Sequence, residues 1–287
     1  MIVALLVGGA ALAHAAWNIA MKRAGTSGTP FIAVTLLIGV VVFAPFGVTA
    51  LVAGPPPSPA WIGLVVGSAA LQLGYFLLLQ RAYRLADVGV VYPLARGVGP
   101  LLSVIAAVIV LGERPGAVAL AGALLVVAGV VVIGLAGSRQ HDSDAQRRWR
   151  GIRYGAAVGA VIAAYTLWDA AAVTIADLDP VGYYWASMVV QLLVLGGIAL
   201  RSPTAVVQTA RRHPVAATVV GVLSPLAYGA VLFAYQLAPV SIVAPAREVS
   251  VVLIALAGWM LFREPHPVRR LIGSALVLAG IALLVSE

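Results

Sequence analysis

The stretch that decides the fold is Tyr92–Glu113, YPLARGVGPLLSVIAAVIVLGE, and a second version of it occupies Val243–Glu264, VAPAREVSVVLIALAGWMLFRE. Each version places a proline and an arginine inside a strongly apolar run and ends in a glutamate. A charged arginine inside a membrane-length helix is costly, so its occurrence at matching places in two runs indicates a purpose. The two stretches predict a duplicated membrane protein in which both arginines are candidate functional residues.

The composition of the whole chain indicates the same class. The 287 residues are 62% hydrophobic and 10% charged, whereas soluble domains are about 25% charged. At about 20 apolar residues per crossing, this length allows roughly ten helices with short loops. The predicted fold class is therefore an all-α polytopic membrane protein. We expect no cleavable signal peptide, because the first apolar run continues over Ile2–Ala20 and is long enough to span a bilayer.

Charge and motif content narrow the function. The net charge of +8 is expected in short loops that face anionic membrane lipid, not nucleic acid. The sequence has no cysteine, which excludes disulfides, thiolate metal sites and cysteine nucleophiles. Its four histidines are scattered, and H-E-x-x-H, G-x-S-x-G and P-loop patterns are absent. We therefore expect no metal site, no cofactor and no enzyme activity.

Ten apolar segments of spanning length are predicted, in two groups of five. They are Ile2–Ala20, Pro30–Val52, Trp61–Leu85, Val88–Leu111, Gly116–Ala136, Ile152–Ala176, Val181–Leu200, Val215–Leu237, Val240–Phe262 and Val268–Val285. The polar stretch Gly137–Arg150 separates the groups and is interpreted as a solvated linker. The predicted organisation is a first repeat over residues 1–136, a linker over 137–151 and a second repeat over 152–287.

The two groups repeat one another. A shift of 151 residues carries Trp17-Asn18 onto Trp168-Asp169 and Arg96 onto Arg247, and it also carries Gly122 and Gly129 onto Gly273 and Gly280. Before the arginine the shift is 152, as between Pro93 and Pro245, so the second copy lacks one residue there. Five helices is an odd number, so the second repeat is expected to enter the membrane inverted relative to the first, around a central cavity.

Orientation follows from the positive charges in the loops. The odd-numbered loops hold nearly all loop lysines and arginines, and the even-numbered loops hold only Arg114. The positive-inside rule places the odd loops in the cytoplasm and both termini outside. The sequence thus predicts a multi-pass protein of the cell (inner) membrane.

The sequence resembles the EamA-type carriers of the drug/metabolite transporter superfamily. The resemblance covers nearly the whole chain as two tandem repeats, and three motifs carry it: HAAWN (His14–Asn18), YPLARG (Tyr92–Gly97) and LGERP (Leu111–Pro115). It implies a basket of helices around a central cavity, and export or exchange of small metabolites by alternating access. Relatives are often drawn with both termini in the cytoplasm, which is the reverse of the orientation that the loop charges predict.

Several side chains are candidates for the cavity wall and for substrate binding. His14, Trp17 and Asn18 share one helix face, and Tyr165, Trp168 and Asp169 repeat that spacing in the second half. The alternative is packed polar contacts between helices with an interfacial tryptophan. Further candidates of the same kind are Gln72, Tyr75, Tyr92 and Tyr228.

The two arginines need partners. Arg96 and Arg247 are expected to face protein, water or an acidic group, with Asp169 and Glu248 as the obvious acids. One interpretation is contact with an anionic or zwitterionic substrate, and the other is a structural ion pair. Because of the missing residue, Arg96 is the expected unpaired substrate contact and Arg247 the paired or gating residue.

Pro93 and Pro245 are candidate gating residues. Each lies early in its span, removes a backbone donor and is expected to kink or open the helix beside the arginine. The alternative is a helix that simply begins later.

The sequence therefore predicts a secondary transporter for a small amphipathic or anionic metabolite, amino-acid-like or bearing a carboxylate or phosphonate. Coupling to a proton is open, and the expected oligomeric state is a monomer or a weak homodimer. The competing hypotheses are a broad-specificity efflux pump for cationic drugs and a membrane-embedded enzyme or sensory scaffold.

Overall fold

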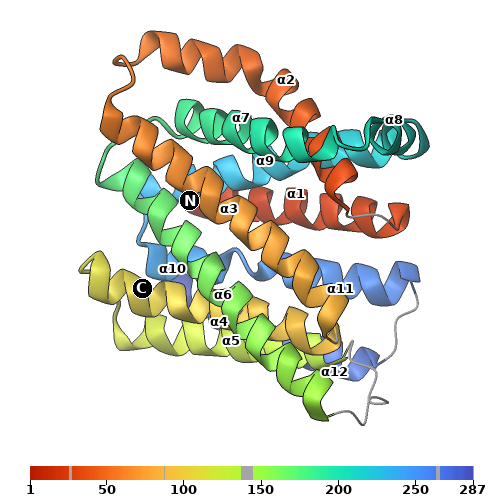
Figure 1. Cartoon of the computed structure of the whole chain (residues 1–287). Helices are drawn as coiled ribbons and strands as arrows, with labels where there is room; N and C mark the ends of the chain where they lie inside the picture. Colours follow the sequence, from red (N-terminus) through yellow and green to blue (C-terminus); the bar gives the residue numbers. More distant parts are fainter. Residues whose placement is uncertain (26–27, 87, 137–144, 263–265, 287) are drawn as a thin grey trace.

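The computed structural model describes residues 1–25, 28–86, 88–136, 145–262 and 266–286. Within these ranges the chain forms helices and short connections (Figure 1). The first half contains α1 (Ile2–Ala24), α2 (Thr29–Ala53), α3 (Pro59–Leu85), α4 (Val88–Val110) and α5 (Ala117–Ala136). The second half contains α6 (Ala145–Thr174), α7 (Pro180–Ala199), α8 (Pro203–Arg212), α9 (Pro214–Leu237), α10 (Val240–Ala246), α11 (Val249–Phe262) and α12 (Pro267–Val285).

Local chemistry at the helix ends accounts for several of these boundaries. The Ser58 side chain accepts a hydrogen bond from the Trp61 amide at 3.1 Å and caps α3. Asp179 caps α7 in the same way, through the Gly182 amide at 2.7 Å. Gly25 ends α1 in the left-handed conformation, at φ 63°, which favours glycine.

Ten segments of the described chain are long and apolar enough to cross a membrane, which confirms the predicted number of spans. Their outward faces carry exposed leucine, valine and isoleucine side chains, as lipid contact requires. Two details were not predicted. The fourth span forms the continuous helix α4, but the matching span over Val240–Phe262 is interrupted between α10 and α11. The loop after α7 also contains the short helix α8, whose Val206 and Ala210 pack inward while Arg211 and Arg212 are exposed.

The last residues of the predicted linker are helical. Residues 137–144 lie outside the described part of the chain, and residues 145–151 already belong to α6. The polar residues Gln146 and Arg150 lie in the first turns of that helix, as an extension beyond its apolar segment. The helix can continue because helical residues outside the bilayer interior tolerate polar side chains.

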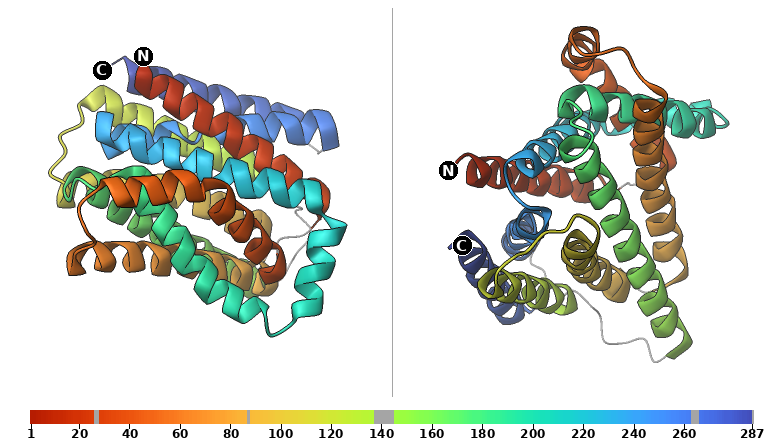
Figure 2. Two further views of the ribbon diagram at one scale, coloured as in Figure 1. Left: turned by 90° about the horizontal axis from the view of Figure 1, so that it is seen from above. Right: turned by 90° about the vertical axis from the view of Figure 1, so that its left-hand side faces the viewer.

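Helices α5 and α12 lie side by side at one edge of the bundle (Figures 1 and 2). A Cβ atom added at Gly122 would lie 2.7 Å from the Gly280 carbonyl oxygen, and one at Gly129 would lie 2.6 Å from that of Gly273. The glycines therefore allow close approach of two antiparallel helices. This face is covered within the chain and is not available for a dimer contact.

Both termini lie at the same end of the bundle, which we call the terminal end (Figure 2). The opposite end holds the C-terminus of α5, the N-terminus of α6 and the helix α8, and we call it the linker end.

Candidate functional site

A cavity of about 390 Å³ lies between the helices and extends to the linker end. Its lining reaches Met21 in α1, Tyr83 in α3 and Leu195 in α7. Each of these residues is within about one turn of the linker-end terminus of its helix. On α1 and α3 the lining stops near the middle of the bundle, at Ala10 and Gln72, whereas on α7 it continues to Tyr184, near the terminal-end start of that helix. On α1 and α3 the cavity therefore extends further toward the linker end than toward the terminal end.

An ion cluster of Arg96, Glu248 and Arg247 forms part of the cavity wall. The Arg96 Nη2 atom lies 2.9 Å from Glu248 Oε2, and the Arg247 Nε atom lies 3.7 Å from Glu248 Oε1. The glutamate is 1% exposed, so one buried carboxylate faces two arginines. The cluster therefore carries one unbalanced positive charge next to the cavity.

The hydrogen-bonding capacity of this cluster is not exhausted. Arg96 Nη2 also donates to the Ser250 hydroxyl at 3.5 Å, and Arg247 Nη2 donates to the Thr166 hydroxyl at 3.3 Å. The short Arg96–Glu248 contact is an ion pair whose angles fall outside hydrogen-bond geometry. It leaves Arg96 Nε and Glu248 Oε2 without a hydrogen-bond partner. Both atoms are buried from solvent, so each carries the cost of an unsatisfied buried polar group.

The interruption between α10 and α11 brings Arg247 and Glu248 to the wall. Arg247 and Glu248 lie in a turn after Pro245, where the Glu248 amide donates to the Pro245 carbonyl at 2.9 Å. In the first repeat, α4 continues through Pro93, which packs against Gly134 of α5. The predicted opening beside the proline is therefore absent in the first copy and present, just after the proline, in the second. Neither proline lines the cavity.

The expected division between the two arginines is not seen, because both pair with Glu248. Arg96 was predicted to be unpaired, yet it makes the shorter contact to Glu248. The Arg247 side chain is adjacent in sequence to Glu248, and the turn points its Nη2 toward Thr166 on α6. The physical reason is the break after α10, which places Glu248 across from α4.

Asp169 is the centre of a second polar cluster. Its carboxylate accepts hydrogen bonds from Tyr183 at 2.7 Å, Tyr228 at 2.6 Å and Gln72 at 3.1 Å. Asp169 is fully buried and is not among the residues that line the cavity. It was predicted to pair with an arginine, but neutral donors from α3, α7 and α9 surround it instead.

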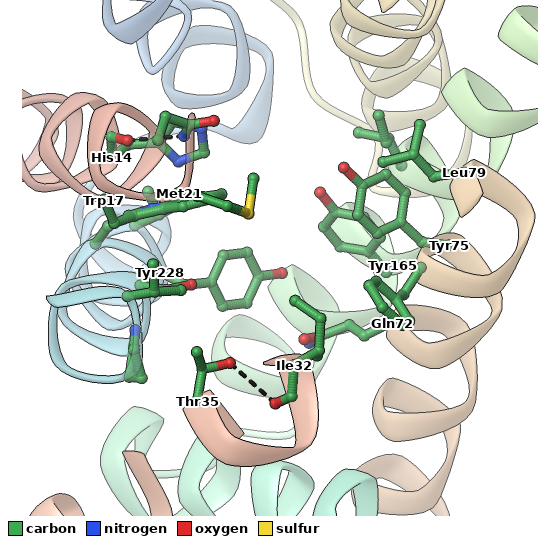
Figure 3. Close-up of a pocket in the computed structure, with 18 of the residues that line it drawn as sticks. His14, Trp17, Met21, Ile32, Thr35, Gln72, Tyr75, Leu79, Tyr165 and Tyr228 are labelled. Atoms are coloured by element: carbon green, nitrogen blue, oxygen red, sulfur yellow. Dashed lines mark hydrogen bonds between the residues drawn. The ribbon is translucent and has the colours of Figure 1, made fainter. Parts of the chain in front are cut away.

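Aromatic side chains form the remaining wall (Figure 3). Tyr165 packs edge-on between Tyr75 and Tyr228, with ring centroids 5.8 Å and 6.0 Å away. His14 and Trp17 lie on the opposite side of the cavity, with their rings 4.8 Å apart. The cavity therefore combines flat apolar surfaces with a positively charged patch.

Most of the predicted binding residues meet at this cavity. The lining includes His14, Trp17, Asn18, Gln72, Tyr75, Tyr92, Arg96, Tyr165, Tyr228, Arg247 and Glu248. Trp168 and Asp169 are not part of it, although their spacing matched that of Trp17 and Asn18. In the described part of the chain, no group of three or more acidic or histidine side chains is placed to hold a metal ion.

Comparison with known proteins agrees with this architecture. The model of the EamA-like transporter family matches residues 1–135 and again residues 149–286, which together cover nearly the whole chain. The chain belongs to this family. The EamA-like transporters are part of the drug/metabolite transporter superfamily, so the chain is a membrane transporter.

The solved structures support the fold of this EamA-like transporter. One crystal structure, described only as that of a protein, shares 20% sequence identity and a TM-score of 0.78. The alignment covers 98% of this chain and 95% of the other. At this identity the likeness shows the fold alone. A search of curated proteins finds no match.

The terminal end of the transporter is closed by contacts between helices. The Trp168 indole donates to the Leu64 carbonyl at 2.8 Å, and its ring occupies the space left by Gly67 on α3. Trp168 therefore faces away from the cavity, because α3 leaves space for its ring at Gly67 and provides the Leu64 carbonyl as a hydrogen-bond acceptor. Trp17, its counterpart in the first repeat, has an indole nitrogen that is buried without a hydrogen-bond partner.

Glu113 also joins the two repeats at the terminal end. Its carboxylate accepts hydrogen bonds from the Val240 amide at 2.7 Å and the Ser241 amide at 2.9 Å, at the start of α10. The counterpart Glu264 lies outside the described residues.

Sequence reasoning missed several polar residues of the two clusters. They are Ser68, Thr166, Tyr183, Gln191 and Ser250, which extend the hydrogen bonds of Asp169 and of the arginines. Serine, threonine and tyrosine are common in membrane helices, so type alone does not single them out. The one available signal was helical spacing. Gln191 and Ser187 lie four residues apart on one face of α7.

Proposed function

We propose that this EamA-like transporter moves a small anionic or zwitterionic metabolite, amino-acid-like or bearing a carboxylate or phosphonate. The observation that carries the proposal is the ion cluster, in which two arginines at the cavity wall share one glutamate. A substrate anion would balance the remaining positive charge and could accept from the two arginine side chains, which are partly exposed at the cavity wall. The tyrosine wall and Trp17 would hold the apolar part of the substrate.

The proposed mechanism is alternating access between two inverted repeats, over residues 1–136 and 152–287 with a connecting segment between them. The antiparallel contact of Gly122 with Gly280, and of Gly129 with Gly273, supports it, since the repeat shift exchanges these pairs. The helix contacts obey the same exchange, because α1 packs on α9 and α3 packs on α6. A cavity whose lining on α1 and α3 reaches the linker end but stops short of the terminal end fits one state of such a cycle.

We further propose that the linker end faces the cytoplasm of a cell whose inner membrane holds the carrier, and that transport is export or exchange. The odd-numbered loops with their arginines lie at that end. Because the chain has no cysteine, single cysteines at positions 3 and 286 can report the side of the termini. We expect a membrane-impermeant maleimide to label both in intact cells. Labelling only after the membrane is opened would reverse the orientation.

The function is tested by transport in proteoliposomes that contain the purified protein and an imposed proton gradient. A library of labelled amino acids, organic acids and phosphonates should contain at least one compound that accumulates above protein-free vesicles. Competition then separates the substrate classes: anionic or zwitterionic compounds should inhibit uptake, and hydrophobic cations should not. Inhibition by cations alone would favour drug efflux and overturn the proposed substrate class.

A further inference from the structure

Asp169 is a buried acid that the proposed substrate site does not use. It is 0% exposed on a membrane-spanning helix, one layer behind the cavity wall. Among the described residues, both ion pairs of the nearby arginines go to Glu248 and none goes to Asp169. An ionised carboxylate in such surroundings is costly without a cation, and an ionisable group within a membrane span is a functional candidate.

The groups that face Asp169 are neutral or acidic. From α7 and α9 the titratable side chains are tyrosines, which are Tyr183, Tyr184, Tyr228 and Tyr235. From α3 the facing side chains are the amide of Gln72 and the hydroxyl of Ser68, both neutral. The cavity wall also carries Arg247 and Glu248 from the turn after α10, and Arg96 from α4. Both arginines pair with Glu248 there. No fixed cation among the described residues therefore holds Asp169 in its ionised form.

The donors around Asp169 can be satisfied in either charge state. Tyr183 has a second acceptor in the Leu64 carbonyl at 3.5 Å, and Gln72 has one in the Ser68 hydroxyl at 3.1 Å. The Tyr228 hydroxyl can rotate and accept from a protonated carboxyl. Adding a proton to Asp169 therefore leaves no buried donor without an acceptor. A network with only one possible arrangement of hydrogen bonds would instead oppose protonation.

A short route joins Asp169 to the cavity. Tyr228 and Gln72 both line the cavity and both donate to Asp169 Oδ2. We propose that Asp169 is the proton-binding site of the transport cycle, and that a proton from cavity water reaches its carboxylate past Tyr228 to give the neutral acid. This inference rests on the proposed transport function, to which it adds the coupling site.

The position of Asp169 explains how a proton could influence the conformation. Its hydrogen bonds tie α6 to α3 of the first repeat and to α7 and α9 of the second. Among these three bonds only the one from Gln72 joins the two repeats, and protonation weakens it by removing the negative charge that the amide faces. The first repeat has Asn18 at the matching position, which donates to the His14 carbonyl in its own helix. The second repeat thus holds the titratable member of this pair, and one proton per cycle is expected from it.

Infrared difference spectroscopy on the reconstituted wild-type protein tests the site without any substrate. On changing from alkaline to acidic buffer, a carboxylic-acid C=O band typical of an apolar environment should appear. Asp169→Asn should lose this band, and Tyr228→Phe should shift its frequency because the nearest hydroxyl is gone. Glu113→Gln, which changes an acid at the terminal end, should keep it.

The outcomes separate the two hypotheses. If the band is unchanged in Asp169→Asn and unshifted in Tyr228→Phe, the proton site is wrong, whatever the vesicles transport. The Tyr228→Phe result decides the matter if Asp169→Asn fails to fold. With any compound that the vesicle screen identifies, Asp169→Asn should lose gradient-driven accumulation to the level of empty liposomes and keep counterflow exchange. If Asp169→Asn loses the band but the wild-type protein transports no compound of the library, the transport proposal is overturned and the proton site stands.

Discussion

Glu248→Ala is expected to lower the free energy of unfolding by about 3–5 kcal/mol, the usual cost of removing one partner from a buried ion pair. The substitution leaves Arg96 and Arg247 facing each other at a cavity wall without their shared carboxylate. Two like charges in a membrane interior can reduce this cost only by admitting water or by moving apart. Thermal unfolding of the purified protein in detergent, followed by tryptophan fluorescence, measures the loss.

A second substitution tests the reason for that loss. Arg247→Met in the Glu248→Ala background should recover part of the stability, because it removes one of the two unbalanced charges. Glu113→Ala provides a comparison with an acid that accepts only backbone hydrogen bonds, and its loss should be about 1 kcal/mol, as for other helix caps. If Glu248→Ala unfolds at the same temperature as the wild-type protein, the ion cluster does not stabilise the fold.

Arg96→Ala and Arg247→Ala are each expected to reduce uptake into vesicles by about ten- to a hundred-fold, the worth of a hydrogen bond to a charged group. Removing either arginine leaves the other balanced by Glu248, so the positive charge that would attract an anion disappears. Uptake of the compound identified in proteoliposomes measures the effect, with membrane insertion checked by the amount of purified protein.

The controls for this prediction use the same residue type. Arg211→Ala on the exposed face of α8 should transport normally, because its side chain is far from the lining. Arg96→Lys should retain part of the activity, since lysine keeps the charge but not the planar fork of donors. Normal transport by both alanine variants would show that the arginines form a structural ion pair only.

The spans and their repetition could be predicted because both depend on patterns within one helix. Apolar segments of about 20 residues define crossings, and Arg96 and Arg247 share a register that chance does not produce. The helix faces of His14 and Tyr165 followed from spacing alone, and both residues line the cavity. The sequence was therefore informative about features that depend on the pattern within a single helix.

The interactions between helices could not be predicted in this way. Trp168 has the spacing of Trp17, but the side on which it packs depends on Gly67 and the Leu64 carbonyl of another helix. Asp169 was assigned to an arginine because opposite charges attract, whereas tyrosine and glutamine donors supply its hydrogen bonds. The choice of partner is a property of the assembled bundle.

The contact between α5 and α12 has a consequence for how the protein is made. Helix α5 leaves the ribosome in the first half of synthesis, and α12 follows every other described helix of the chain. Until α12 arrives, the face of α5 that carries Gly122 and Gly129 has only lipid beside it. The backbone-to-backbone approach that joins the two repeats is therefore among the last contacts to form. A chain released before α12 is made would have the other described helices but would lack the contact between α5 and α12.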